Sequence, residues 1–506
     1  MTEPSTSGLV LIVGAGPTGL TLACELARRG VRFRLFEAAG GPQQGSRGKG
    51  VQPRSLEIFE GLGIAERVLA HGQPAMAMVS TGPDGSVTVG GEVPAELRDR
   101  PDIPFPASLI TPQWRVEQAL RERLAELGGA VEFGAELVGL DQSDGAVAAI
   151  MEKGGACETV VADWLVGCDG GHSTVRKHTT IGFEGETRES VRMLVADVRV
   201  EGLDRESWHM WRHPEGAVAL CPLPSTGLFQ FQASIAPGQD GAQVLDNLQT
   251  ILERRSGRTD IRLGEPEWTT LWRANVRLAD HYRDGRVLLA GDAAHVHSPA
   301  GGQGMNTGIQ DAANLGWKLA AVTRGASVAL LDSYEAERRP IAAAVLGLSD
   351  QRLAQALEHK GMTTRRDAST IQLDVGYRDS ALSRDDRDDR DAGSPLRAGD
   401  RAPDATGLTT VDGDRRLFDL LRGGRFTLLS FDGAYDAGSA PADVHTLQVV
   451  TRATAPGHIV DAAAHLADAY QPTDRTLVLI RPDGYIGLIS DASDQAAVSD
   501  YLAAIR

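Results

Sequence analysis

The chain has 506 residues, of which 42% are hydrophobic, and a formal net charge of −17 at pH 7. The length predicts two or three domains rather than one hydrophobic core, and the acidic charge argues against a nucleic acid as partner. No apolar stretch reaches about 18 residues and the polar N-terminus shows no signal-peptide pattern, so we expect no membrane partner and a cytoplasmic protein.

The first predicted element is a dinucleotide-binding fingerprint. The apolar run at residues 8–13 predicts a strand buried on both faces, and a helical pattern follows it and ends at Gly30. Residues 31–35 alternate as in a second strand, which ends at Glu37. Strand, glycine-rich turn, helix, strand and acid in this order indicate nucleotide binding. The turn contains Gly14, Gly16, Pro17, Thr18 and Gly19.

Each position of the fingerprint has a physical role. Gly14 permits a tight turn, Gly16 lets a pyrophosphate approach the backbone, and Gly19 lets helix and strand pack closely. The helix N-terminus faces the phosphates with unpaired N–H groups. Glu37 is placed to accept hydrogen bonds from a ribose diol, which disfavours a 2′-phosphate, so the bound nucleotide is FAD or NAD rather than NADP.

Two later glycine-rich motifs favour FAD. Residues 168–172 read Cys-Asp-Gly-Gly-His, and residues 291–295 read Gly-Asp-Ala-Ala-His; each motif follows a short apolar strand. Asp292 in the later motif can bind the ribityl chain of a flavin. The loop at residues 299–306 leads into a predicted helix, whose N-terminal partial positive charge would stabilise an anionic reduced flavin ring.

With these three motifs in this order, the chain resembles the group A FAD-dependent aromatic hydroxylases, the family of para-hydroxybenzoate hydroxylase. Within that family it is most similar to the actinobacterial aromatic polyketide hydroxylases and rifampicin monooxygenase. The resemblance covers essentially the whole chain. It implies an α/β fold, in which a Rossmann-like FAD-binding domain carries an inserted β-sheet substrate domain and is followed by a C-terminal thioredoxin-like domain.

The resemblance also implies roles for single residues. Arg47 would lie by the FAD diphosphate and the approach of NAD(P)H, Gln113 by the ribityl or phosphate region, and Leu137 against the adenine. Asp292 would bind the ribityl chain, and Pro299 would lie beside the flavin N5 and the substrate carbon. Asp169 belongs to a motif linked to FAD and NAD(P)H, although a plain turn is the alternative. The loop residues expected at the cofactor are Gly302, Gly304, Met305 and Asn306, the last two through backbone groups at the isoalloxazine.

The domain prediction interleaves two units along the chain. Alternating segments at residues 217–221 and 228–232 predict an open sheet with one face toward a ligand. A flat polycyclic substrate would stack well on its aromatic side chains, although core packing is the favoured interpretation of any single one. These candidates are Trp208, Trp211, Phe229 and Phe231. The predicted parts are residues 1–70, 107–180 and 281–330 for the FAD domain, and 71–106 and 181–280 for the substrate domain.

The remainder of the chain is predicted to form a helical segment with a charged linker over 331–394 and a third domain over 395–506. The mixed charge run at residues 384–391 is typical of a solvated linker. Apolar strands at residues 426–430 and 476–480 resemble those of a thioredoxin-like domain. Because this domain contains no cysteine, thiol–disulfide chemistry is excluded there, and we expect a structural or assembly role.

No Ser–His–Asp order, zinc spacing or P-loop is present, and the four scattered cysteines have no metal spacing, so we expect no metal site and chemistry supplied by the cofactor. The resemblance implies a monooxygenase with non-covalent FAD. It would consume NAD(P)H and molecular oxygen and hydroxylate a polycyclic aromatic substrate of polyketide type through a flavin C4a-hydroperoxide. The alternatives are a Baeyer–Villiger oxygenase, an oxygen-independent flavin reductase or dehydrogenase, and a non-catalytic flavin- or drug-binding protein. The oligomeric state, a homodimer included, is left open.

Overall fold

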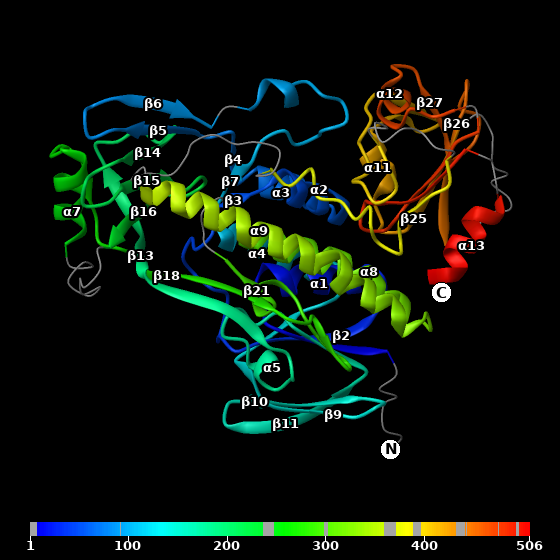
Figure 1. Ribbon diagram of the computed structural model, residues 1–506, viewed down its shortest axis with the longest axis horizontal. Helices are drawn as coiled ribbons and strands as arrows, with labels where there is room; N and C mark the ends of the chain where they lie inside the picture. The colour runs from blue at the N-terminus through cyan, green and yellow to red at the C-terminus, as the bar shows by residue number, and fades with distance from the viewer. Residues whose placement is uncertain are drawn as a thin grey trace.

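The computed structural model describes residues 8–91, 93–235, 247–297, 302–358, 371–387, 396–431, 441, 443–473, 475–491 and 495–505. Two helices, α8 (Gly304–Val322) and α9 (Asp332–Glu358), cross the middle of the molecule (Figure 1). A large β-sheet lies to their left in this view and the C-terminal sheet to their right. Within these described ranges, no helix is both long and apolar enough to cross a membrane.

A mostly parallel sheet forms the centre of the N-terminal part. Its strand order is β19-β20-β12-β1-β2-β8, and only β19 runs antiparallel to its neighbour. Leu11 and Ile12 of β1 are fully buried, as expected for a strand covered on both faces. Helix α1 (Pro17–Ala27) packs between α8 and α4 (Gln113–Glu126). The strands are β1 (Leu9–Val13), β2 (Arg32–Glu37), β8 (Val131–Phe133), β12 (Trp164–Gly167), β19 (Arg283–Asp284) and β20 (Val287–Leu289).

Smaller elements surround this sheet. An antiparallel sheet of β9 (Ala135–Gln142), β10 (Val147–Lys153) and β11 (Ala156–Ala162) lies at the bottom of Figure 1. Short strands β3 (Gly50–Val51) and β4 (Gln73–Pro74) both pair with β7 (Leu109–Ile110). The connecting helices are α2 (Pro53–Leu62), α3 (Ala65–Leu69) and α5 (Thr174–Lys177).

The large sheet has the strand order β21-β18-β13-β16-β15-β14-β5-β6, and β17 pairs with β13 at its side. Helix α7 (Leu248–Ser256) covers one of its faces through Leu248 and Leu252, which belong to the same hydrophobic cluster as side chains of β13 and β16. The strands are β5 (Ala77–Thr81), β6 (Val87–Gly90), β13 (Phe183–Glu201), β14 (Ser207–Trp211), β15 (Val218–Pro222), β16 (Leu228–Ile235), β17 (Arg262–Leu263), β18 (Trp268–Ala279) and β21 (His295–Val296).

The C-terminal sheet has the order β22-β29-β28-β25-β26-β27-β23-β24. Strands β25, β26 and β27 are parallel to one another, whereas β28 is antiparallel to both of its neighbours, β25 and β29. This mixed pattern agrees with the thioredoxin-like unit expected from the sequence. The strands are β22 (Arg384–Asp385), β23 (Leu408–Thr410), β24 (Gly413–Arg415), β25 (Phe426–Phe431), β26 (Val444–Val449), β27 (His458–Asp461), β28 (Leu477–Ile480) and β29 (Ile486–Ser490), with helices α11 (Leu417–Leu421), α12 (His465–Tyr470) and α13 (Gln495–Ile505).

The start of the charged run is more than a solvated linker. Arg384 and Asp385 are exposed, as expected, but they form β22, which pairs in parallel with Leu488 and Ile489 of β29. The prediction missed this strand because a run of charged residues shows no apolar alternation, while the backbone makes the pairing. The Asp385 carboxylate is also bound, since it accepts hydrogen bonds from Arg387 at 2.7 Å and from Ala398 N at 3.3 Å. Residues 388–391 of the run lie outside the described residues.

Candidate functional site

The three glycine-rich motifs meet at one edge of the parallel sheet. Strands β1, β12 and β20 are neighbours and run in the same direction. Their last residues are Val13, Gly167 and Leu289; the first two motifs begin directly after their strands and the third begins one residue later, at Gly291. The carboxyl edge of such a sheet is where ligands of open α/β folds bind.

The first turn is so closely packed that two of its three glycines, Gly14 and Gly19, cannot carry side chains. Gly14 has a φ of +101°, and a Cβ there would lie 2.4 Å from the carbonyl oxygen of Cys168. A Cβ on Gly19 would lie 1.9 Å from the carbonyl oxygen of Gly14. A Cβ on Gly16, in contrast, would have no heavy atom within 4 Å. Gly14 and Gly19 therefore serve packing, and Gly16 faces open space.

The third motif contacts the first through Thr18. A Cβ on Gly291 would lie 2.5 Å from Thr18 Oγ1, and one on Gly308 of α8 would lie 2.3 Å from the same atom. Pro17 is the first residue of α1, and no side chain caps this N-terminus. The N-terminal turns of α1 and α8 and the Gly291–Asp292 loop are thus in mutual contact, with uncapped N–H groups at the start of α1.

Glu37 binds the first turn directly. Its Oε2 accepts a hydrogen bond from Ala15 N at 2.9 Å, and its Oε1 accepts one from Ala39 N at 3.0 Å. The side chain is half-buried at the end of β2, beside the turn. It therefore holds the turn in shape, and its expected contact with a ribose stays a prediction.

Asp292 is exposed, whereas the residues around it are buried. Desolvation by the surrounding protein raises its pKa even though solvent still reaches the side chain. Its loop is held from behind by Asp311 of α8, whose Oδ2 accepts hydrogen bonds from Gly291 N at 3.1 Å and interacts with His295 Nε2 at 2.6 Å. Burial alone would raise the pKa of Asp311, but the charges of His295 and Arg338 hold it at about 2. A carboxylate at position 311 thus fixes the backbone that presents Asp292.

Asn306 ties the start of α8 to the segment before α2. Its Oδ1 accepts a hydrogen bond from Gln52 N at 2.8 Å, and its Nδ2 donates to Gly50 O and Gly302 O, both at 2.9 Å. Met305 is half-buried and Gly302 exposed. Gly304 begins α8 against the ring of His297. Pro299 lies outside the described residues, so its place beside the flavin stays a prediction.

The remaining cofactor candidates lie at three separate places. Arg47 and Gln113 are brought together, because Gln113 N donates to Gly48 O at 2.9 Å and starts α4 beside the loop that carries the exposed Arg47. Asp169 accepts hydrogen bonds from Ser173 Oγ at 2.6 Å and Val175 N at 3.0 Å, so it shapes the turn before α5, as the plain-turn alternative expects. Leu137 is 2% exposed in the main hydrophobic core, and its contact with an adenine stays a prediction.

The aromatic candidates lie on opposite faces of the large sheet. Trp211, Phe229 and Phe231 belong to the core under α7, which agrees with the core-packing alternative. Trp208 lies on the other face, in a cluster with Met210 and with Ile110 of the N-terminal part. Of the four, only Trp208 therefore faces the side of the sheet that meets the predicted FAD domain.

A buried polar cluster beside Trp208 was missed by the sequence analysis. Lys49 Nζ lies 4.2 Å from the centre of the Trp208 ring and bonds to Gln230 Oε1. Gln230 also donates to Arg47 O at 3.1 Å. Asp197 accepts two hydrogen bonds from Ser46, and burial raises its pKa. The alternation of Gln230 with the two phenylalanines of β16 was the available signal, since it places polar and aromatic side chains on different faces.

Comparisons with known proteins agree with this geometry. Residues 8–374 match the family model described as FAD binding domain, and residues 396–505 match the model of the aromatic-ring hydroxylase C-terminal region. A flavin-dependent monooxygenase of Mycobacteroides abscessus is 44% identical over 98% of this chain and 99% of its own length. A 6-methylpretetramide 4-monooxygenase of Streptomyces rimosus is 35% identical over 98% of this chain and 93% of its own.

Among solved structures, a ternary complex of aklavinone-11 hydroxylase with FAD and aklavinone superposes with a TM-score of 0.84. It is 25% identical and covers all of this chain and 99% of its own. The resemblance and the fold class predicted from the sequence are therefore confirmed.

Proposed function

This chain belongs to the family of FAD-dependent aromatic-ring hydroxylases, which are flavin-dependent monooxygenases, and we propose that it uses NAD(P)H and molecular oxygen to hydroxylate a polycyclic aromatic substrate of polyketide type. The substrate class is supported by the relatives, one of which is named for 6-methylpretetramide and another of which was solved with aklavinone. A cytoplasmic location and a transiently bound NAD(P)H belong to the same proposal.

The residues at the carboxyl edge suit an FAD molecule. The open space at Gly16 and the uncapped N-terminus of α1 leave backbone N–H groups accessible to a pyrophosphate. Arg47 is exposed nearby as a cation for the same group, and the exposed Asp292 can accept hydrogen bonds from ribityl hydroxyls. We infer that these residues, with Gln113 beside Arg47, hold the cofactor without a covalent bond.

When bound, FAD supplies the redox chemistry: it accepts a hydride from NAD(P)H and activates molecular oxygen. The chain supplies position and electrostatics. The N-terminus of α8 carries a partial positive charge, and Asn306 fixes this helix end against Gly50 and Gln52. The large sheet carries Trp208 on the face that packs against Ile110 of the N-terminal part, and we expect a substrate bound on this face to keep water from the reacting atoms.

The contact among the three glycine-rich motifs at the ends of β1, β12 and β20 carries this proposal, because an extended nucleotide requires such a meeting of segments that are far apart in the sequence. The direct test is turnover of the purified protein with NADH or NADPH and a panel of anthraquinone, angucycline, tetracycline-type and ansamycin compounds, followed by mass spectrometry of the products.

A product with one additional oxygen on an intact ring supports the proposal. A ring expanded to a lactone moves the assignment to a Baeyer–Villiger oxygenase. Equal turnover without oxygen indicates a reductase or dehydrogenase. Protein that binds FAD but never consumes NAD(P)H with any compound indicates a binding protein and contradicts the proposal.

A further inference from the structure

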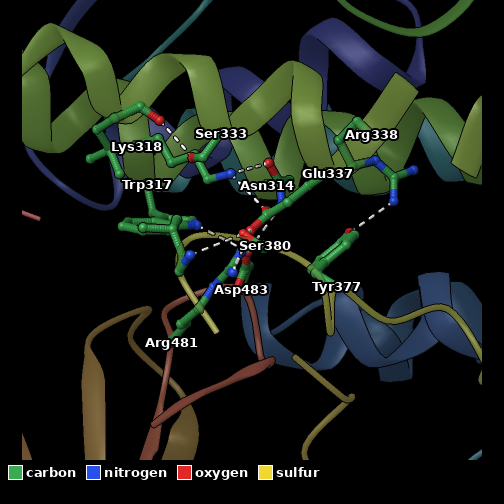
Figure 2. A network of polar contacts seen from close by, with 12 residues as sticks. Asn314, Trp317, Lys318, Ser333, Glu337, Arg338, Tyr377, Ser380, Arg481 and Asp483 are labelled. Carbon is green, nitrogen blue, oxygen red and sulfur yellow. Dashed lines mark hydrogen bonds and ion pairs between the residues drawn. The ribbon is translucent and has the colours of Figure 1, made fainter. Parts of the chain in front are cut away.

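A buried ionic network joins the C-terminal domain to the helices beside the predicted flavin site (Figure 2). Its centre is Glu337 of α9. This carboxylate accepts two hydrogen bonds from Arg481, at 2.7 and 2.9 Å, and one from Lys318 of α8, at 2.7 Å. Arg481 also pairs with Asp483 at 2.6 Å. All four side chains are at most 1% exposed, so these charges have no contact with solvent.

Neutral groups complete the network. Asn314 Nδ2 donates to Glu337 Oε2 at 2.6 Å, and Ser380 Oγ donates to Glu337 Oε1, also at 2.6 Å. Trp317 Nε1 donates to Asp483 Oδ2 at 3.0 Å. Although burial opposes ionisation, the cations of Arg481 and Lys318 hold the pKa of Glu337 well below its ordinary value. Glu337 therefore stays ionised at physiological pH, whereas burial lowers the pKa of Lys318 to about 8. The network joins α8, α9 and the turn before β29.

Arg338, the next residue of α9, extends these contacts toward the Gly291–Asp292 loop. Arg338 donates to Asp311 Oδ1 at 2.8 Å, to Tyr377 Oη at 2.9 Å and to the carbonyl oxygen of Thr307 at 3.2 Å. Asp311 in turn accepts the hydrogen bond from Gly291 N, directly before Asp292. Side-chain contacts thus lead from Arg481 in the C-terminal domain to the Gly291–Asp292 loop, joined by the backbone of α9 between Glu337 and Arg338 and ending at the backbone N–H of Gly291.

The geometry of these hydrogen bonds couples the position of α9 to that of α8. Glu337 and Arg338 are adjacent in α9, and they bind α8 at two levels: Asn314 and Lys318 for one, Thr307 and Asp311 for the other. A rotation or shift of α9 would strain both sets at once. Removal of one partner of a buried ion pair leaves an uncompensated charge, which forces the rest to rearrange.

We propose that Arg481 and Asp483 are positioning residues of the flavin site, which act through Glu337, Arg338 and Asp311 on the Gly291–Asp292 loop. This gives the C-terminal domain a role in cofactor binding although it contributes no group to the chemistry. The inference rests on the proposed function, since it requires that Asp292 contact FAD.

A double-mutant cycle on the holoenzyme tests the proposal. Arg481→Met, Asp292→Ala and the double variant are compared with the wild-type protein by the dissociation constant for FAD, measured from flavin fluorescence well below the unfolding temperature. Arg481→Met should weaken FAD binding roughly three- to thirty-fold, the usual range for residues along a coupled path, and by a clearly smaller factor when Asp292 is already alanine. If Arg481→Met does not fold, the same measurements are made on Arg481→Lys, which keeps the positive charge but loses the bidentate contact with Glu337.

A matched control separates cofactor positioning from plain stability. Arg416 pairs with the buried Asp404 at 2.8 Å within the C-terminal domain, and this pair takes no part in the network around Glu337 as far as the structure describes it. Arg416→Met should lower the melting temperature and leave the affinity for FAD unchanged. The positioning role would be overturned if Arg481→Met weakened FAD binding by the same factor in the wild-type protein and in Asp292→Ala. It would also be overturned if neither Arg481 variant changed the affinity for FAD. A wild-type protein that binds no FAD would overturn the proposed function and this inference with it.

Discussion

Two glycines of the first turn, three residues apart, should respond differently to the same substitution by alanine. In Gly19→Ala the new methyl group would lie 1.9 Å from the carbonyl oxygen of Gly14 and 3.3 Å from Cys168 Cβ. The first contact involves backbone, which cannot move without shifting the end of β1. Overpacking of this kind costs about 1–3 kcal/mol or more, so the variant without cofactor should unfold at a clearly lower denaturant concentration.

In Gly16→Ala the methyl group meets no protein atom within 4 Å, and the φ of −72° suits any residue. The stability of the cofactor-free protein should therefore stay within about 0.5 kcal/mol of the wild type. The methyl group does occupy the space by which a pyrophosphate reaches the backbone. Loss of hydrogen bonds to a charged group costs about 1.5–3 kcal/mol, so FAD should bind roughly ten- to hundred-fold more weakly.

The assay pairs denaturant unfolding of the cofactor-free proteins with titration of FAD by fluorescence. Gly145→Ala, at a glycine that also has open space but lies in the β9–β10 turn, is the control and should change neither quantity. FAD affinity of Gly16→Ala equal to that of the wild type, or an unfolding midpoint of Gly19→Ala equal to that of the wild type, would refute the assignment of the two glycines.

Three further substitutions follow from the site. Asp292→Ala should weaken FAD binding by about 1–3 kcal/mol in the same titration, because ribityl hydroxyls lose their acceptor. The pKa of Asp311 is about 2 in the folded protein and about 3.9 when unfolded, so its ionisation stabilises the fold above pH 4 and this gain is lost as the pH falls toward 2; Asp311→Asn should unfold less steeply with acid over that window. Phe229→Ala should destabilise the protein by about 3–5 kcal/mol in denaturant and leave FAD affinity unchanged, since Phe229 packs under α7 away from the site.

The sequence could predict the parts of the site that depend on local pattern. The apolar run before Gly14, the helix that follows it and the strand that ends at Glu37 each follow from short-range periodicity and glycine placement. The structure contains all of them, with the helix beginning at Pro17. That these elements lie beside the motifs near Asp169 and Asp292 was inferred from the family resemblance, because no local sequence pattern determines which strands become neighbours in a sheet.

The network around Glu337 could not be predicted, because its partners are far apart in the sequence. Arg338 and Asp311 are 27 positions apart, and Arg481 and Glu337 are 144 apart. A partial signal existed: polar residues recur at helical spacing in α8, at Asp311, Asn314 and Lys318. Likewise, period-two alternation places Phe229 and Phe231 on one face of β16, but only the position of α7 shows that this face is core.

Turnover under oxygen gas labelled with the heavy isotope, with an accepted aromatic substrate and NAD(P)H, shows whether the protein is an aromatic-ring hydroxylase that uses molecular oxygen. We expect a product that carries one labelled oxygen atom on an intact ring, while the second atom leaves as water. Label that enters the product from solvent water, or equal product formation without oxygen, would contradict this expectation.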